Sequence, residues 1–140
     1  MKINFKLFFI LVGLTVIFSS CRTSAPRLDY QALARASVLL GIDINLEDDH
    51  KLYLEAADWI GAPYRGGGDS KRGTDCSGMV YQIYRKVYRI QVPRNTEELK
   101  NKSNKVAKRN LKEGDLVFFS SNRSRKRVAH VGIYLKSGKF

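Results

Sequence analysis

The sequence predicts an α+β fold, with helices from its first two thirds packed on an antiparallel β-sheet from its last third. Apolar residues recur at three- and four-residue spacing between residues 52 and 87, which is the period of a helix with one buried face. Two runs rich in Val, Ile and Phe follow at 115–119 and 128–135, and this composition is typical of strands. Helices first and strands afterwards favour one helical layer on one sheet.

Two helices are predicted in the first part of the chain. One covers residues 32–40 and ends at Gly41. The other begins after Asp48 or Asp49, since either side chain can cap a helix, and a Gly and a Pro stop it shortly after its last apolar residue. Its apolar positions are Leu52, Ala56, Trp59 and Ile60.

A third helix is predicted to begin at Cys76, after a glycine-rich loop over residues 64–73. Asp75 or Thr74 lies at the place of its cap. A short helical turn is expected near residues 95–98, where either Asn95 or Thr96 can act as the cap before two glutamates. The apolar positions of the third helix are Met79, Val80, Ile83, Tyr84 and Val87, so we expect it to be buried.

The two predicted strands are joined by a strongly basic tract over residues 123–127, which we interpret as a solvated loop. This arrangement indicates an antiparallel hairpin or two neighbouring strands. Ser137 and Gly138 form the next predicted turn, and Phe140 is expected to be the first residue of a further strand.

The first twenty residues have the pattern of an export signal. Two lysines precede an apolar run over residues 7–18, which is too short to span a membrane. Ser19 and Ser20 directly before Cys21 resemble the lipobox of bacterial lipoproteins, in which the cysteine gains a lipid on its sulfur and becomes the new N-terminus. The alternative is simple signal cleavage, with Cys21 an incidental residue.

The sequence divides into three predicted parts. These are a signal peptide at 1–20, a lipid-anchored tether with a short helix at 21–46, and one domain at 47–140. About a hundred residues after Gly41 are enough for one domain and not for two. We therefore expect a protein of the cell envelope, anchored to a membrane and facing the periplasm.

The charge of the chain bears on its partners. The 140 residues include 25 Lys and Arg against 13 Asp and Glu, a formal net charge of +12. Nucleic acid is the usual partner of so basic a domain, but export removes it from reach, so we expect no nucleic-acid partner. Anionic lipid headgroups and cell-wall polymers are the expected counterparts.

Cys76 is the candidate nucleophile. If Cys21 carries lipid, Cys76 has no partner for a disulfide within the chain, and an unpaired thiol in an exported protein needs a reason such as catalysis. The thiolate is the reactive form, and the unsatisfied amide groups at a helix start stabilise negative charge. One cysteine and two histidines are too few for a typical zinc site, so no metal and no cofactor is expected.

His130 is the candidate general base. Alternate residues of a strand share a face, so Val131 and Ile133 would point into a core while His130 and Gly132 point the other way. The histidine could then meet the start of the third helix, or it could be an exposed strand residue without a task. His50 lies among charged residues at the start of a helix, where a solvated side chain explains it.

Four stretches carry a more specific signal. They are W-I-G-A-P-Y-R-G-G at 59–67, T-D-C-S-G at 74–78, G-D-L-V-F-F at 114–119 and A-H-V-G-I-Y at 129–134. In this order they resemble the NlpC-like cell-wall peptidases, which are papain-related cysteine enzymes that cleave peptidoglycan stem peptides. Any one stretch is weak evidence, whereas the ordered set is specific.

The resemblance implies a papain-like fold and a role for each matching residue. Cys76 would be the nucleophile, His130 its general base, and Tyr64 would help bind the oxyanion. Asp75 and Ser77 would hold polar groups of the substrate. The family cuts the bond between D-glutamate and the following diamino acid through a thioester intermediate, and the resemblance implies no cofactor.

The chain departs from the family pattern after its last predicted strand. The family has a third polar residue, often histidine, on a strand just beyond Phe140, so the sequence is expected to be truncated, with C-terminal strands missing and activity impaired. One alternative is therefore a catalytically inactive, wall-binding lipoprotein with the same fold. Another is a thiol amidase or acyltransferase on a similar scaffold.

Overall fold

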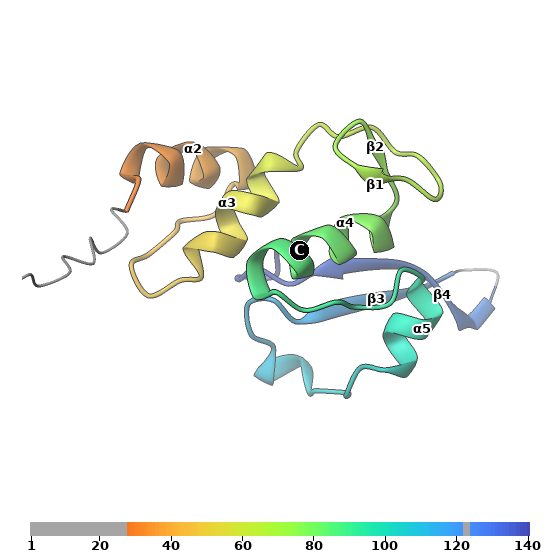
Figure 1. Cartoon of the computed structure of the whole chain (residues 1–140). Coiled ribbons are helices and arrows are strands. Elements are labelled where there is room, and N and C mark those ends of the chain that lie inside the picture. The colour runs from red at the N-terminus through yellow and green to blue at the C-terminus, as the bar shows by residue number, and fades with distance from the viewer. Residues whose placement is uncertain (1–27, 122–123) are drawn as a thin grey trace, which may run out of the picture.

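The computed structural model describes residues 28–121 and 124–140, with the backbone alone at 121 and 124–127. Figure 1 shows helices in the first part of the chain and a β-hairpin in the last, the predicted α+β arrangement with an antiparallel sheet. The predicted signal peptide, the lipidation of Cys21 and the start of the tether lie outside the described residues. Within them, no helix is long and apolar enough to cross a bilayer.

The first two helices, α2 (Tyr30–Leu40) and α3 (His50–Asp58), match the prediction closely. The Asp29 side chain caps α2, which therefore begins two residues earlier than expected and shortens the tether. Gly41 ends α2 in the left-handed conformation, at φ 61°. Asp49 caps α3 by accepting from the amide of Leu52, which settles the alternative between the two aspartates.

The predicted apolar face of α3 is wrong at one position. Leu52 is fully buried and Trp59 nearly so, whereas the side chain of Ile60 is exposed. The reason is that α3 ends at Asp58, so that Ile60 lies in the turn that follows and no longer has helical spacing to the core.

The glycine-rich loop is more ordered than the sequence predicts. It contains a small hairpin of two strands, β1 (Asp69–Ser70) and β2 (Gly73–Thr74), which pair antiparallel. The next helix, α4 (Cys76–Ile83), starts at the predicted residue and continues as one wider π-helical turn, η2 (Tyr84–Tyr88). The β1–β2 hairpin therefore leads directly into the start of α4.

Two short helical segments connect α4 to the sheet. Helix α5 (Thr96–Asn101) is capped by Asn95, whose side chain accepts from the amide of Glu98, as one of the two predicted caps. The 3-10 turn η3 (Lys108–Asn110) follows it. Farther along, Glu113 ties this connection to α3, because its carboxylate accepts from the Tyr53 hydroxyl at 2.7 Å and from the amide of Asp49 at 2.8 Å.

Strands β3 (Leu116–Ser121) and β4 (Ser124–Ile133) form the predicted antiparallel hairpin. The basic tract is not a loop over its whole length, since β4 already begins at Ser124; cross-strand pairing after a register shift extends the hairpin into it. The turn at 137–138 is present, with Gly138 at φ 79°. Phe140 is not part of a strand.

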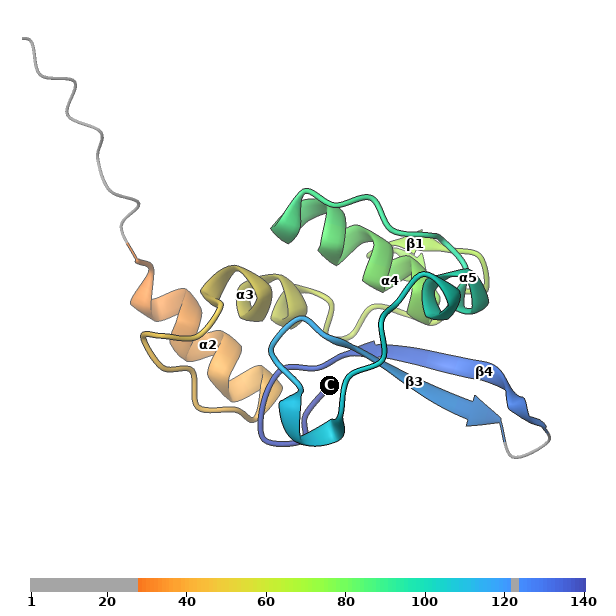
Figure 2. The ribbon, with the colours of Figure 1, turned by 90° about the horizontal axis from the view of Figure 1, so that it is seen from below.

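The core lies between the helices and one face of the hairpin. Val80 and Ile83 of α4 share a buried cluster with Val131 and Ile133 of β4 and with Leu99 of α5. Figure 2 shows α4 and α5 beside the β3–β4 hairpin, in agreement with their contacts to β4. The start of α4 is thereby held against the sheet strand that carries His130.

Candidate functional site

Cys76 is the first residue of α4, where helical amide groups have no partner within the helix. Asp75, in an extended conformation, is the N-cap, and its carboxylate accepts from the Gly78 amide at 2.8 Å. The thiol is partly buried against the core cluster and is not part of a disulfide. The predicted position of the cysteine at a capped helix start is confirmed.

A group of polar contacts, here called the N-cap cluster, surrounds Asp75 and consists of Asp75, Ser77, Arg94 and the backbone of Gly67 and Gly68. Arg94 Nη1 donates to Asp75 Oδ1 at 2.7 Å and to Ser77 Oγ at 2.8 Å. Arg94 Nη2 donates to the Gly68 carbonyl at 2.5 Å, and the Gly67 amide donates to Asp75 Oδ2 at 2.7 Å. The cluster joins the glycine-rich loop, the α4 start and the segment before α5.

The electrostatics of this cluster fix the charge of Asp75. Burial alone would raise the pKa of its carboxyl, but the bonds from Arg94, from the Gly78 and Gly67 amides and from Ser77 outweigh it and hold the pKa at about 2. The carboxylate is therefore ionised at neutral pH.

Gly78 leaves room for the cluster beneath the first turn of α4. A Cβ at this position would lie 2.2 Å from the Gly68 carbonyl oxygen and 2.6 Å from Arg94 Nη2. No side chain fits there without displacing backbone. The glycine after Ser77 thus allows the loop to approach the helix start.

Tyr64 is brought to the site by its backbone. It forms an isolated parallel bridge with Thr74, two residues before Cys76, and the neighbouring Arg65 amide donates to the Thr74 carbonyl at 2.8 Å. The Tyr64 side chain is 79% exposed. Its ring is therefore available to a bound molecule in the neighbourhood of the helix start.

Arg94 and Thr96 were not assigned a role from the sequence. Thr96, the first residue of α5, places its Oγ1 3.9 Å from Cys76 Sγ, and Arg94 belongs to the N-cap cluster. Nothing in the sequence marks this segment as a partner of α4, because the contact spans 20 residues and depends on where α5 packs. A basic residue shortly before a capped helical turn is the only signal, and it is weak.

His130 pairs with Phe119 across the hairpin, and the two ring centroids are 6.1 Å apart. The predicted alternation of β4 is confirmed, since Val131 and Ile133 are buried while His130 is exposed. Gly132 faces Phe140 on the same side as His130, away from the buried residues that pack on α4. In the described residues no hydrogen bond joins the His130 ring to the Cys76 thiol.

His50, the second histidine of the chain, lies at the start of α3. His50 is partly exposed and its Nε2 lies 2.7 Å from the Asn45 carbonyl, a local contact at the start of α3. Across residues 28–121 and 124–140, no three His, Cys, Asp or Glu side chains gather in a way that would hold a metal ion.

Comparison with known proteins gives one consistent result. Residues 61–140 match the NlpC/P60 family. The chain is 31% identical to the probable endopeptidase NlpC homolog of Haemophilus influenzae, over 96% of this chain and 82% of that protein. It is 36% identical to the murein DD-endopeptidase MepS/murein LD-carboxypeptidase of Escherichia coli K12, over 69% of this chain and 50% of that protein.

A solved structure supports the same relation. The NlpC/p60 domain of the peptidoglycan hydrolase SagA superposes with a TM-score of 0.55 at 30% identity, covering 68% of this chain and 76% of that one. The family match over residues 61–140 includes the β1–β2 hairpin, helix α4 with Cys76, and the β3–β4 hairpin.

Proposed function

The chain belongs to the NlpC/P60 family of cysteine peptidases that hydrolyse peptidoglycan, and from this premise we propose that it cuts stem peptides with Cys76 as its nucleophile. The observation that carries the proposal is the partly buried thiol at the capped start of α4. The helix amides stabilise the thiolate, and the N-cap cluster holds the helix start in place.

The chemistry has two halves. The Cys76 thiolate attacks the amide carbonyl, and the C–N bond breaks when protonated His130 gives its proton to the leaving amine, which leaves a thioester. Water, activated by neutral His130, then releases the acid and restores the thiol. The Cys76 amide and the Tyr64 hydroxyl are the proposed donors to the tetrahedral oxyanion.

The two catalytic assignments have different support. Cys76 rests on its own environment, whereas His130 contacts Phe119 and has no hydrogen bond to the thiol. The base assignment therefore rests on the family resemblance alone.

We propose the bond between D-glutamate and the following diamino acid as the one that is cut. The name of MepS covers DD-endopeptidase and LD-carboxypeptidase activities, which are the alternatives. Asp75 and Ser77 were predicted to hold substrate, but their hydrogen bonds in this structure are internal to the N-cap cluster. In our proposal they act mainly by fixing the glycine-rich loop and the start of α4, and exposed Tyr64 contacts the peptide directly.

The location follows from the substrate. A peptidoglycan hydrolase acts in the cell envelope, and the predicted signal at 1–20 and lipid on Cys21 would place the domain at a membrane facing the periplasm. A mass spectrum of the protein from cell membranes tests this directly. A diacylated N-terminal Cys21 is expected, and an unmodified one would contradict the anchor.

One observation favours the second candidate, an inactive wall-binding lipoprotein. No hydrogen bond joins the imidazole to the thiol here, and a thiol enzyme without its base loses most of its rate. This candidate predicts that the protein sediments with insoluble wall material and releases nothing from it under reducing conditions.

Release of soluble fragments from purified peptidoglycan sacculi decides between the two. The protein should release fragments ending in D-glutamate, and Cys76→Ala should lower the rate at least about a thousandfold while leaving the fold intact. Ser103→Ala serves as the matched control, because it removes a comparable small polar group at an exposed position in the chain. Equal release by wild type and Cys76→Ala would refute the nucleophile.

A further inference from the structure

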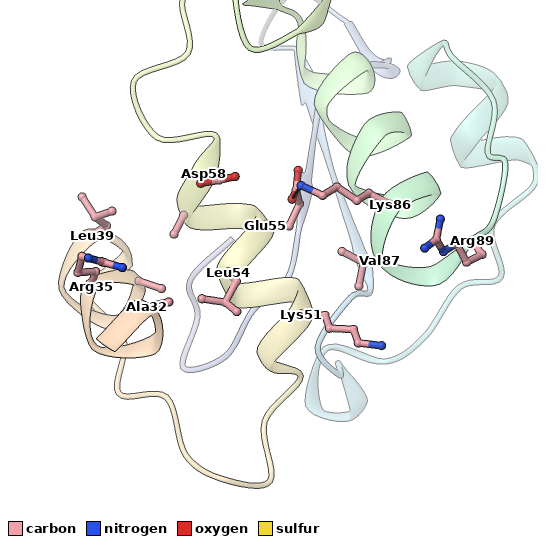
Figure 3. A pocket seen from close by; sticks show the side chains of 12 residues that line it. Ala32, Arg35, Leu39, Lys51, Leu54, Glu55, Asp58, Lys86, Val87 and Arg89 are labelled. Atoms are coloured by element: carbon pink, nitrogen blue, oxygen red, sulfur yellow. Dashed lines mark ion pairs between the residues drawn. The ribbon is translucent and has the colours of Figure 1, made fainter. Parts of the chain in front are cut away.

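One large pocket lies far from Cys76, between α2, α3 and the η2 turn. It has a volume of about 600 Å³. Figure 3 shows the side chains around it, with Leu39 and Arg35 on α2, Leu54 on α3 and Val87 on η2. Its inner surface is therefore mostly apolar, although the pocket is open to solvent.

Four cationic side chains surround this apolar floor. They are Arg35, Lys51, Lys86 and Arg89. Two carboxylates also line the pocket, and both have cationic partners: Glu55 pairs with Lys86, and Asp58 pairs with Lys71 at 2.6 Å. Arg35, Lys51 and Arg89 are exposed and have no acidic partner among the described residues, so they carry net positive charge at the rim.

Helix α2 also exposes aliphatic side chains beside this pocket. Val38 is 83% exposed and Leu39 is 56% exposed, and both follow Arg35 by one helical turn. Exposed aliphatic side chains next to cationic ones, on the outer side of a helix, are the pattern of a helix that lies in a membrane interface. We call Arg35, Val38, Leu39, Lys51 and Arg89 the basic-apolar face.

Two further features indicate a bilayer as the occupant. Cys21, the proposed lipid-bearing residue, precedes Tyr30 at the start of α2 by nine residues, which can reach about 30 Å at most. The first helix of the domain is thus confined to the neighbourhood of the membrane. After removal of Lys2 and Lys6 with the predicted signal, the formal net charge of +12 becomes +10, which anionic headgroups complement.

The geometry of α4 gives this surface a consequence for catalysis. Val87 lies at the pocket, eleven residues along the same continuous helical segment from Cys76, a separation of about 16 Å at the rise of an α-helix. A domain resting on its basic-apolar face would hold the Cys76 end of α4 away from the bilayer. Cys76 would then face the peptidoglycan.

We propose that the basic-apolar face is a docking surface for an anionic phospholipid bilayer, which orients the domain with Cys76 directed toward the wall. The proposal rests on the proposed envelope location but not on the proposed cleavage. The cationic rim attracts the headgroups, and Val38 and Leu39 enter the interface. Cell-wall polyanions are the competing occupant and form one outcome of the test.

The experiment measures co-sedimentation of the mature chain, residues 21–140 with Cys21→Ser so that no lipid is present, with vesicles. Vesicles of phosphatidylcholine alone are compared with vesicles containing 30% phosphatidylglycerol. Binding is expected only with phosphatidylglycerol and should weaken in 0.5 M NaCl, which screens the headgroup charge. Binding to neither vesicle, or equally to both, overturns the proposal.

A charge variant locates the surface. Arg35→Gln/Lys51→Gln/Arg89→Gln should weaken vesicle binding at least about tenfold, since each cation near an anionic surface contributes several-fold. The control Lys105→Gln/Lys108→Gln/Arg109→Gln removes the same charge from an exposed segment near η3 and should retain binding. Equal losses of vesicle binding in the two variants would show that only the net charge of the protein matters. That result would overturn the assignment of the docking surface.

An apolar variant and a wall assay complete the test. Leu39→Ser should lower the vesicle binding that remains at high salt by about tenfold, because that binding depends on burial of apolar surface. The triple variant should bind purified sacculi as well as the wild type does; a loss there with intact vesicle binding would assign the face to wall polymers. If the wild-type protein binds vesicles but does not cleave peptidoglycan, the result would count against the proposed function and not against the docking surface.

Discussion

The two ends of the candidate site are built in different ways. The thiol end is fixed by the N-cap cluster, in which one arginine, one carboxylate and two loop glycines bond to each other around the start of α4. The imidazole end is held by aromatic contacts, with His130 beside Phe119 and Phe119 beside Phe140 at 4.8 Å. Directional polar contacts fix a backbone more closely than ring packing on an exposed strand face does.

This difference shows which half of the site is complete within the described structure. The helix start has its cap, its loop and its charge partner in place. Among the residues whose side chains the structure describes, none forms a hydrogen bond with the His130 ring. Stability and activity should therefore respond differently to changes at the two ends, and the following predictions are ordered from the largest expected loss of stability to the smallest.

Gly78→Ala should cause the largest loss of stability, because it disturbs the start of α4. Its new Cβ would lie 2.2 Å from the Gly68 carbonyl oxygen, so either the loop or the helix must move, at a cost of about 3 kcal/mol in the free energy of unfolding. Urea denaturation measures it. Gly66→Ala is the control, because a Cβ there meets nothing within 4 Å, and equal midpoints of the two variants would contradict the close approach.

Arg94→Leu should cost about 2 kcal/mol, because it leaves the largely buried Asp75 carboxylate without its cationic partner. The value is reduced for the partial exposure of Arg94. Lys102→Ala removes an exposed ion pair with Glu98 on α5 and should change the free energy of unfolding by less than about 0.5 kcal/mol. If both variants unfold at the same urea concentration, the N-cap cluster does not stabilise the fold.

Acid should weaken the thiol end through Asp75. Its pKa is about 2 in the folded protein against an ordinary value of 3.8, so the unfolded chain binds a proton more readily as the pH falls. The stabilisation is complete above about pH 4 and is lost as the pH approaches 2, by roughly 2 kcal/mol.

Thermal unfolding between pH 5 and pH 2 measures this effect. Asp75→Asn should flatten the dependence in that window, because the amide still caps α4 but does not titrate. Asp58, whose pKa is lowered chiefly by its bond to Lys71, adds a slope of the same sign and should keep it in the variant. An unchanged acid slope in Asp75→Asn would count against the Arg94 pairing.

His130→Gln should have the smallest effect on stability, within about 0.5 kcal/mol, because the ring is exposed. Its effect on cleavage should be large if His130 is the base, about a hundredfold or more in kcat. Phe119→Leu, which changes only the ring beside it, is the control for packing. Full activity of His130→Gln would show that another residue is the general base. The assignment of Cys76 as nucleophile would not be affected.

Much of the site follows from short-range rules. Asp75 was one of two residues predicted to cap the Cys76 helix, and the structure settles the choice on it, since a cap is set by residues three apart. The buried alternation of Val131 and Ile133 followed in the same way from the period of a strand. Arg94 could not be predicted, because its bonds to Asp75 and Gly68 span 19 and 26 residues.

The errors have the same origin. Ile60 was expected to be buried because it continued a helical pattern, but the helix ends at Asp58 and the turn points it outward. The basic tract was interpreted as a loop because charge alone favours solvent, whereas cross-strand pairing extends β4 to Ser124. In both cases a local pattern misplaced the boundary of an element.

By itself, the sequence determined the order of the main helices and strands, most of the faces that they bury, and that Cys76 stands at a helix start. Caps, periodicity and turn residues act over three or four positions, so they can be read without coordinates. Only the tertiary structure decided that Arg94 and Gly68 lock the cap of α4, that His130 lies beside Phe119, and that α2, α3 and η2 enclose a basic-apolar face. These depend on how distant segments pack, and packing is a property of the whole chain.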